Sequence, residues 1–425
     1  MADTHDSTSI LNEVSEARLL DLERALIRIP SSAFEEHEIA DYLAEYMAQV
    51  GLEVEMMPVE NPREAGSFSR QPIGRLKGTG GGPSLMLNGH MDPGVEMPGW
   101  SVDPYGAKFE DGWVWGMGAH DDKGGVAAMI TAVEAIIQSG TRLAGDVLVC
   151  PVVAHKYGGA GTRALVEAGV LADFCINLEH SANTIANVCV GIIMARIRTT
   201  SPDLFFRYSA EAKAGYFNAV EQQAEIIRRL GPSLDPIPEG GWMAFTPHPD
   251  LPGFPMHCID SIHKEHYYHK NYTGLSTREC DLLLQFRTVP GQTLASVRAD
   301  LTRLLDGIKA DHPAFTYDLA MPAPGTEQGW FQDPMEVAKD HAVVAGLAEG
   351  HRLASGEAPH IGGIGRLGNV GDGNITAAAG VPSLQYGPGD IRIYDEWPTP
   401  DERVLLSDLT IAAKAIAHAT WAYCG

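Results

Sequence analysis

Two short stretches of this sequence carry residues suited to metal chemistry. In the first, an apolar run at 84–87 leads to His90 and Asp92, and alternation along an extended chain places both side chains on one face. In the second, Asp121 directly precedes an Asp-Lys-Gly-Gly segment at the start of an expected helix. Imidazole is the commonest transition-metal ligand, and a carboxylate two residues later can orient its ring. We therefore predict a metal site with His90 and Asp121 as ligands. Asp92 is predicted to orient the ring of His90 without binding the metal itself.

These stretches, together with later motifs, resemble a metallopeptidase family. The family contains acetylornithine deacetylase, succinyl-diaminopimelate desuccinylase and glutamate carboxypeptidase, and the resemblance covers nearly the whole chain. The later motifs are Gly-Gly-Ala-Gly-Thr at 158–162, Arg-Thr-Val-Pro-Gly at 287–291, Gly-Pro-Gly at 387–389 and Pro-Asp-Glu at 400–402. Members of the family hold two metal ions that share one bridging aspartate.

The resemblance implies that the ligands of one ion are kept, as His90, Asp121 and Glu179. The family ligand is the first residue of the Asp-x-Lys-Gly pattern, which selects Asp121 over Asp122 and implies a cis peptide bond between them. Taken alone, Glu179 reads as a solvated acid at the end of a strand. Its place directly after the apolar run 174–178 matches the family's ligand position.

This sequence lacks both of the residues that bind only the other ion in the family. The family's Glu-Glu pair before the glycine-rich loop is His155-Lys156 here, and the position of its C-terminal histidine is Pro398. A lysine ammonium has only hydrogen-bond donors and cannot bind a metal ion. We therefore predict one divalent ion per chain, with manganese favoured by the oxygen ligands and zinc also possible.

The same pair carries the predicted acid–base chemistry. His155 occupies the position of the family's general base, and an imidazole can accept and return a proton near neutral pH. The alternative for His155 is a core histidine at a strand end. Lys156 either balances Asp121, binds an anionic group of the substrate or is solvated.

The resemblance also implies residues that bind the substrate. Arg287 matches an arginine that binds a substrate carboxylate, which suits a guanidinium group. Asp372 and Asn374 match a loop that lines the pocket. Arg207 and Tyr208 lie in an aromatic stretch where the family has a histidine pair, and this stretch is either a wall for an aromatic ligand or part of a domain core.

Composition narrows the class of protein. The net charge of −24 and the pI of about 5.0 argue against nucleic acid and anionic membranes as partners. There is no apolar run of the roughly 20 residues that span a bilayer, and the polar N-terminus is unlike a signal peptide. The six cysteines have no paired spacing. We therefore expect a cytoplasmic protein with reduced thiols.

The order of the expected helices and strands predicts an α/β fold in two domains. Strands alternate with helices over residues 1–190, which indicates a catalytic domain with a mixed, largely parallel sheet flanked by helices. Residues 191–312 suit an inserted ferredoxin-like α+β lid and dimerisation domain, and 313–425 return to the catalytic domain. We expect a homo-oligomer, a dimer or larger, in which strands such as 192–198 offer an edge for pairing.

The altered ligand set predicts an enzyme with chemistry outside peptide hydrolysis. Among atypical family members, the chain is most similar to aminohydrolases that replace an aromatic amino group by a hydroxyl group. We expect a metal-dependent hydrolase that releases ammonia from a small anionic aromatic amine by metal-hydroxide attack, with 5-nitroanthranilate giving 5-nitrosalicylate. The alternatives are a deacylase or dipeptidase acting on N-acyl amino acids, and a non-catalytic pseudoenzyme that binds a small anion.

Overall fold

The structure is a computed structural model that describes residues 7–62, 64–202, 216–264, 278–324, 331–364, 370–395 and 398–425. The chain divides into two compact units. The first contains residues 1–189 and 335–425, and the second contains residues 190–334. Arg207 and Tyr208 lie outside the described residues.

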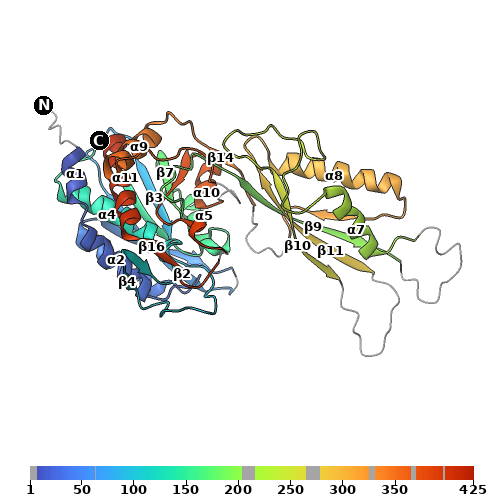
Figure 1. Cartoon of the computed structure of the whole chain (residues 1–425), viewed down its shortest axis with the longest axis horizontal. Coiled ribbons are helices and arrows are strands. Elements are labelled where there is room, and N and C mark those ends of the chain that lie inside the picture. Colours follow the sequence, from blue (N-terminus) through green and yellow to red (C-terminus); the bar gives the residue numbers. More distant parts are fainter. Residues whose placement is uncertain are drawn as a thin grey trace. The chain divides into compact units, whose positions relative to one another are not determined.

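The first unit is built on a six-stranded sheet (Figure 1). Four neighbouring strands run parallel to one another: β6, β3, β7 and β15. Strand β2 pairs antiparallel with both β6 and β1. In sheet order the strands are β1 (Glu53–Glu60), β2 (Phe68–Leu76), β6 (Val147–Val152), β3 (Leu85–His90), β7 (Phe174–Leu178) and β15 (Ser383–Tyr386). This confirms the predicted mixed, largely parallel sheet.

Helices cover both faces of this sheet (Figure 1). Alternation along β3 sends Leu85 and Leu87 into one hydrophobic core and Met86 into the other. The first core is covered by α1 (Ser7–Glu13), α2 (Glu16–Arg28), α3 (His37–Val50), α4 (Lys123–Gln138), α9 (Ala342–Ser355) and α11 (Leu406–Cys424). The opposite face is covered by α5 (Ala160–Glu167) and α10 (Asp372–Ala378). Because both faces are covered, the parallel strands are buried throughout, which explains why most of their residues are apolar.

The parallel strands direct three candidate residues to one edge of the sheet. His90 is the last residue of β3, and Glu179 directly follows β7. His155 begins the short 3₁₀ helix η1 (His155–Tyr157), three residues after β6. The carboxyl ends of neighbouring parallel strands are where α/β sheets bind their ligands.

Smaller elements complete the first unit. Strands β16 (Arg403–Leu405), β5 (Trp113–Trp115) and β4 (Lys108–Glu110) form a three-stranded antiparallel sheet. Strands β8 (Val188–Cys189) and β14 (Met335–Glu336) pair where the chain leaves and re-enters this unit, and η2 (Ile391–Ile393) is a second 3₁₀ helix.

The second unit has the β-α-β-β-α-β order of a ferredoxin-like fold. Its antiparallel sheet has the strand order β10-β11-β9-β12, and β13 also pairs with β9. Alternate apolar residues of β9 and β11 face the helices and form one core with them. The elements are β9 (Gly191–Thr200), α7 (Ala219–Leu230), β10 (Met256–Lys264), β11 (Glu279–Thr288), α8 (Leu294–Asp311), β12 (Asp318–Ala320) and β13 (Phe331–Gln332).

Two expectations about this unit are corrected. We ended the inserted domain at residue 312, but β12 and β13 both pair with β9, so the unit extends to Pro334. We also expected residues 192–198 to offer a free edge, but they lie in β9, which is paired on both sides. Among the described strands, β10 stands at the end of the sheet.

All six cysteines are free thiols. Within the part of the chain that the structure describes, no helix has both the length and the apolar character needed to cross a membrane.

Candidate metal centre

His90 is held in the form that binds a metal ion. Its Nδ1 lies 2.9 Å from the backbone carbonyl of Asp92, and a carbonyl only accepts hydrogen bonds, so Nδ1 carries the hydrogen. Burial, with the neighbouring charges of His155 and Lys156, lowers the pKa of His90 to about 3, so the ring is neutral. Its Nε2 lone pair then faces Asp121 Oδ1 at 3.0 Å. Two acceptors at this distance fit a bound cation.

Asp121 offers one oxygen to such a cation and has the other occupied. Lys156 Nζ donates a hydrogen bond to Asp121 Oδ2 at 2.7 Å, while Oδ1 faces His90. Although burial opposes ionisation, Lys156 and His180 hold the pKa of Asp121 well below its usual value. The peptide bond between Asp121 and Asp122 is cis, as the resemblance implied.

The loop that carries Asp121 is fixed by a buried carboxylate. Glu402, from the Pro-Asp-Glu motif, accepts hydrogen bonds from the backbone N–H groups of Gly118, His120 and Asp121 at 2.8–3.0 Å. This places Asp121 from the backbone as well as from its side chain.

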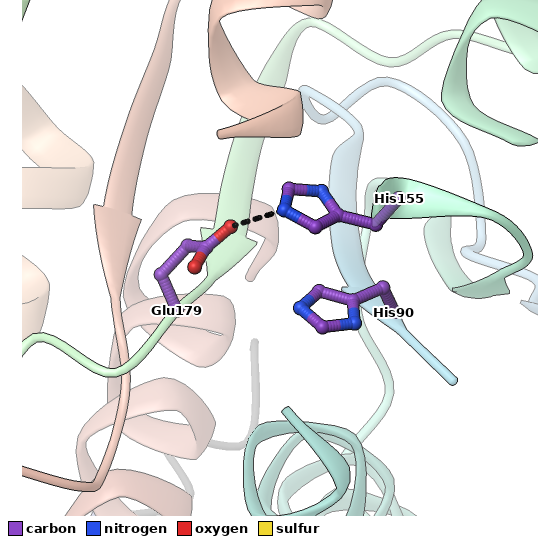
Figure 2. Close-up of side chains that lie close together, drawn as sticks. All are labelled: His90, His155 and Glu179. Carbon is purple, nitrogen blue, oxygen red and sulfur yellow. Dashed lines mark ion pairs between the residues drawn. The ribbon is translucent and has the colours of Figure 1, made fainter. Parts of the chain in front are cut away.

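Glu179 belongs to two groups of candidate ligands. Figure 2 shows its side chain beside His90 and His155, and the ligand atoms of these three residues lie within 4.8 Å of one another. A second group with the same spacing contains Asp121, Glu179 and His180. The predicted ligand His90 thus lies in the first group and Asp121 in the second, while Glu179 lies in both. Burial raises the pKa of Glu179, although the cations nearby oppose this shift.

Asp92 supports the site in a different way from the one predicted. We expected its carboxylate to orient His90, but the backbone carbonyl does this, and the nearer carboxylate oxygen lies 3.7 Å from His90 Nδ1. The carboxylate instead accepts hydrogen bonds from the backbone N–H groups of His155 and Lys156, both at 2.9 Å. It fixes the turn that presents this pair.

His155 is oriented by Asp372. Its Nδ1 lies 2.9 Å from Asp372 Oδ1, and the other oxygen of Asp372 accepts a hydrogen bond from Thr162 Oγ1 at 2.6 Å. Nδ1–H is therefore the donor, and Nε2 points toward Glu179 Oε1 at 3.9 Å (Figure 2). The ring lies parallel to that of His90, with centroids 4.2 Å apart. Burial opposes protonation, but Asp372 and Glu179 outweigh it and raise the pKa of His155 to about 9 in the metal-free protein.

Two residues proposed to bind substrate have clear partners within the protein. Both oxygens of Asp372 are engaged, and its side chain is 2% exposed. The side-chain oxygen of Asn374 accepts a hydrogen bond from the backbone N–H of Gly371 and so caps α10. Arg287 lies on β11 in the second unit, where burial lowers its pKa to about 10, so that an anionic partner would stabilise its charge.

His180 was missed by the sequence analysis. Its Nδ1 lies 3.6 Å from Asp121 Oδ1 and 3.6 Å from Glu179 Oε2. Its ring also lies 4.9 Å from that of His120. In the sequence, the feature that could have indicated His180 is its position directly after the predicted ligand Glu179.

Comparisons with known proteins identify the family of this chain. The profile of the peptidase family M20/M25/M40 matches residues 86–422. The N-formyl-4-amino-5-aminomethyl-2-methylpyrimidine deformylase of Bacillus subtilis is 27% identical over 405 residues, covering 91% of this chain and 89% of the relative. A succinyl-diaminopimelate desuccinylase of Methylorubrum extorquens is 35% identical over 405 residues, covering 92% and 94%.

A solved structure shows the same fold. The crystal structure of a tripeptidase from Staphylococcus aureus aligns with a TM-score of 0.72 at 20% identity, covering 95% of this chain and 97% of the tripeptidase. Because the family profile spans most of the sequence and a relative above 30% identity spans nearly all of it, the chain belongs to the peptidase family M20/M25/M40 and is a metal-dependent hydrolase.

Proposed function

We propose that this protein is a one-ion hydrolase that releases ammonia from a small anionic aromatic amine. The observation that carries the proposal is the 2.7 Å contact between Lys156 Nζ and Asp121 Oδ2. The family resemblance implies two ions that share this aspartate, and a two-ion site would need both of its oxygens. Here the ammonium group of Lys156 holds one of these oxygens. Burial lowers the pKa of Lys156, but the charges of Asp121 and Glu179 outweigh burial and raise this pKa above its usual value.

His90, Asp121 and Glu179 would hold the single ion. A divalent ion bound there would supply a nucleophile near neutral pH by lowering the pKa of a water molecule. One imidazole and two carboxylates suit manganese and also bind zinc.

His155 then serves as the acid–base group. Because Asp372 accepts the hydrogen of Nδ1, the free acceptor of a neutral ring is Nε2, on the side of Glu179 and His90. Nε2 accepts a proton from water as the new C–O bond forms at the ring carbon. It returns that proton to the departing nitrogen as the C–N bond breaks, so that the products are a hydroxylated ring and ammonia.

Two features support the choice of substrate. Lys156 is a cation beside the predicted ligands and suits a carboxylate on the substrate. The Bacillus subtilis relative is named for an N-formylated aminopyrimidine, which is also a small aromatic amine derivative. An aromatic amine with a para nitro group, such as 5-nitroanthranilate, could accept the negative charge that develops during attack.

A second candidate is removal of an acyl group from an amine. It is favoured by the names of the deformylase and desuccinylase relatives. It uses the same ion and the same proton transfer, but it breaks an amide bond and releases a carboxylic acid.

One experiment tests the proposal and separates the two candidates. Protein saturated with manganese or zinc is analysed for metal content, then incubated with 5-nitroanthranilate, N-formyl amines, N-succinyl amino acids and dipeptides. We expect about one equivalent of metal and ammonia release matched by the hydroxylated product. Two tightly bound ions, or acid release without ammonia, would contradict the proposal.

The variant His155→Ala tests the acid–base role. General acid–base catalysis contributes about 10²- to 10⁴-fold, so kcat should fall on that scale while the metal is kept. Loss of the metal would instead make His155 a ligand, as its group with His90 and Glu179 allows.

A further inference from the structure

We infer that His180 is a fourth protein ligand of the same ion, through Nδ1. The inference rests on the proposed one-ion site, but not on its substrate. It adds a second imidazole to a set that the family resemblance limits to one imidazole and two carboxylates.

The spacing of the atoms fits the binding of one ion by His180 together with Asp121 and Glu179. His180 Nδ1 is 3.6 Å from an oxygen of Asp121 and 3.6 Å from an oxygen of Glu179. Two atoms bound at about 2.1 Å to one tetrahedral ion lie roughly 3.4 Å apart. An ion bound to both carboxylates would therefore lie within reach of Nδ1.

The oxygens involved are those left for a metal ion. Lys156 holds Oδ2 of Asp121, whereas Oδ1 faces both His90 Nε2 at 3.0 Å and His180 Nδ1. Glu179 divides its oxygens in the same way, with Oε1 toward His155 and Oε2 toward His180. The ligand atoms of Asp121, Glu179 and His180 lie within 4.8 Å of one another, and His90 Nε2 lies 3.0 Å from Asp121 Oδ1.

The backbone holds His180 in this position. The N–H of Ala182 donates to the carbonyl of Gly389 at 2.7 Å, and the N–H of Asn183 donates to the carbonyl of Gly387 at 2.8 Å. Because the two residues directly after Ser181 are tied to a neighbouring loop, His180 needs little reordering to bind an ion. The His180 side chain is 13% exposed, so water competes weakly for the site.

A second imidazole changes the expected metal preference. Carboxylate and water ligands suit manganese and magnesium, whereas imidazole suits zinc, iron, nickel and copper. We therefore expect the wild-type protein to discriminate more strongly in favour of zinc over manganese than a variant without His180.

The test counts the nitrogen ligands directly, with manganese alone as the probe. Pulsed electron paramagnetic resonance of the manganese-loaded protein reports the coupled imidazole nitrogens, and chelator competition reports the dissociation constants for manganese and zinc. The variants are His180→Ala and, in case the first does not fold, His180→Gln. His418→Gln is the matched control, because His418 is a buried histidine that bonds the carbonyl of Gly346 away from the site.

We expect one coupled nitrogen fewer in the His180 variants and at least tenfold weaker zinc binding, with His418→Gln unchanged in both. An unchanged nitrogen count, or zinc affinity within tenfold of wild type, would overturn the inference. Neither readout uses turnover. If the aromatic amine is not hydrolysed but the nitrogen count still falls by one, the proposed substrate is wrong and His180 is still a ligand.

Discussion

Replacing Asp372 by asparagine isolates the contribution of the group that orients His155. In the wild-type protein, Asp372 Oδ1 accepts the Nδ1 hydrogen at 2.9 Å from a position that is 2% exposed. Asparagine keeps the shape but removes the charge. It can also turn its NH₂ group toward Nδ1, which would move the hydrogen of His155 to Nε2 and block proton acceptance there.

The size of the effect follows from the contact that is lost. A hydrogen bond to a charged group contributes about 1.5–3 kcal/mol. If it acts fully in the transition state, kcat should fall about 10- to 150-fold, since about 1.4 kcal/mol corresponds to tenfold. KM and metal content should change little, because neither predicted metal ligands nor Arg287 are altered.

The assay compares Asp372→Asn with Thr162→Val. The second variant removes the 2.6 Å contact to the other oxygen of Asp372 and leaves the one to His155. It should therefore retain most of kcat. Steady-state kinetics and metal analysis of both variants, with thermal unfolding as a check of folding, make the comparison.

The pH profile gives an independent readout. Asp372 raises the pKa of His155, so its removal should lower that pKa. Because His155 acts as a base in its neutral form, the rising arm of the pH profile of kcat/KM should move to lower pH in Asp372→Asn. A kcat within about threefold of wild type, with an unmoved arm, would refute the idea that Asp372 orients a proton-transferring His155.

Three further outcomes are expected. Arg287→Ala should raise KM strongly and lower kcat less, and an unchanged KM in steady-state kinetics would show that another group holds the substrate anion. In the metal-free protein, the folded-state pKa of about 9 for His155, against 6.5 when unfolded, means that its stabilisation is complete below pH 6.5 and is lost as pH rises to about 9. Denaturant unfolding at pH 6 and pH 9.5 should therefore show a larger loss of stability in wild type than in His155→Ala, and equal losses would contradict this. Light scattering should show a dimer or larger assembly, and a monomer at working concentration would exclude the proposed oligomer.

The sequence indicated where two of the proposed metal ligands lie in the fold because strand ends are recognisable. His90 and Glu179 close apolar runs of the kind that form buried parallel strands, and such strands end at one edge of a sheet. The family resemblance added Asp121, which lies in a loop. Residues whose roles depend on side-chain direction were not predictable in the same way.

Two residues illustrate this limit. Asp92 was expected to contact the ring of His90, but its carboxylate turns toward the backbone of residues 155 and 156. His180 follows Glu179 outside any strand, so no periodicity indicates which way its ring points. The end of the second unit was misplaced for a related reason, since β12 and β13 have only three and two residues and carry too little pattern to be recognised.

The hydrogen bonds of Asp92 have a consequence for how this site can change over evolution. They hold residues 155 and 156 through backbone N–H groups, which every residue except proline possesses. The turn is therefore indifferent to the side chains that it displays. A Glu-Glu pair and a His-Lys pair can occupy the same backbone, so two substitutions exchange the family's general base and a metal ligand for a proton carrier and a fixed cation without rebuilding the loop. The same property makes this turn a suitable place to engineer new reactions into the fold.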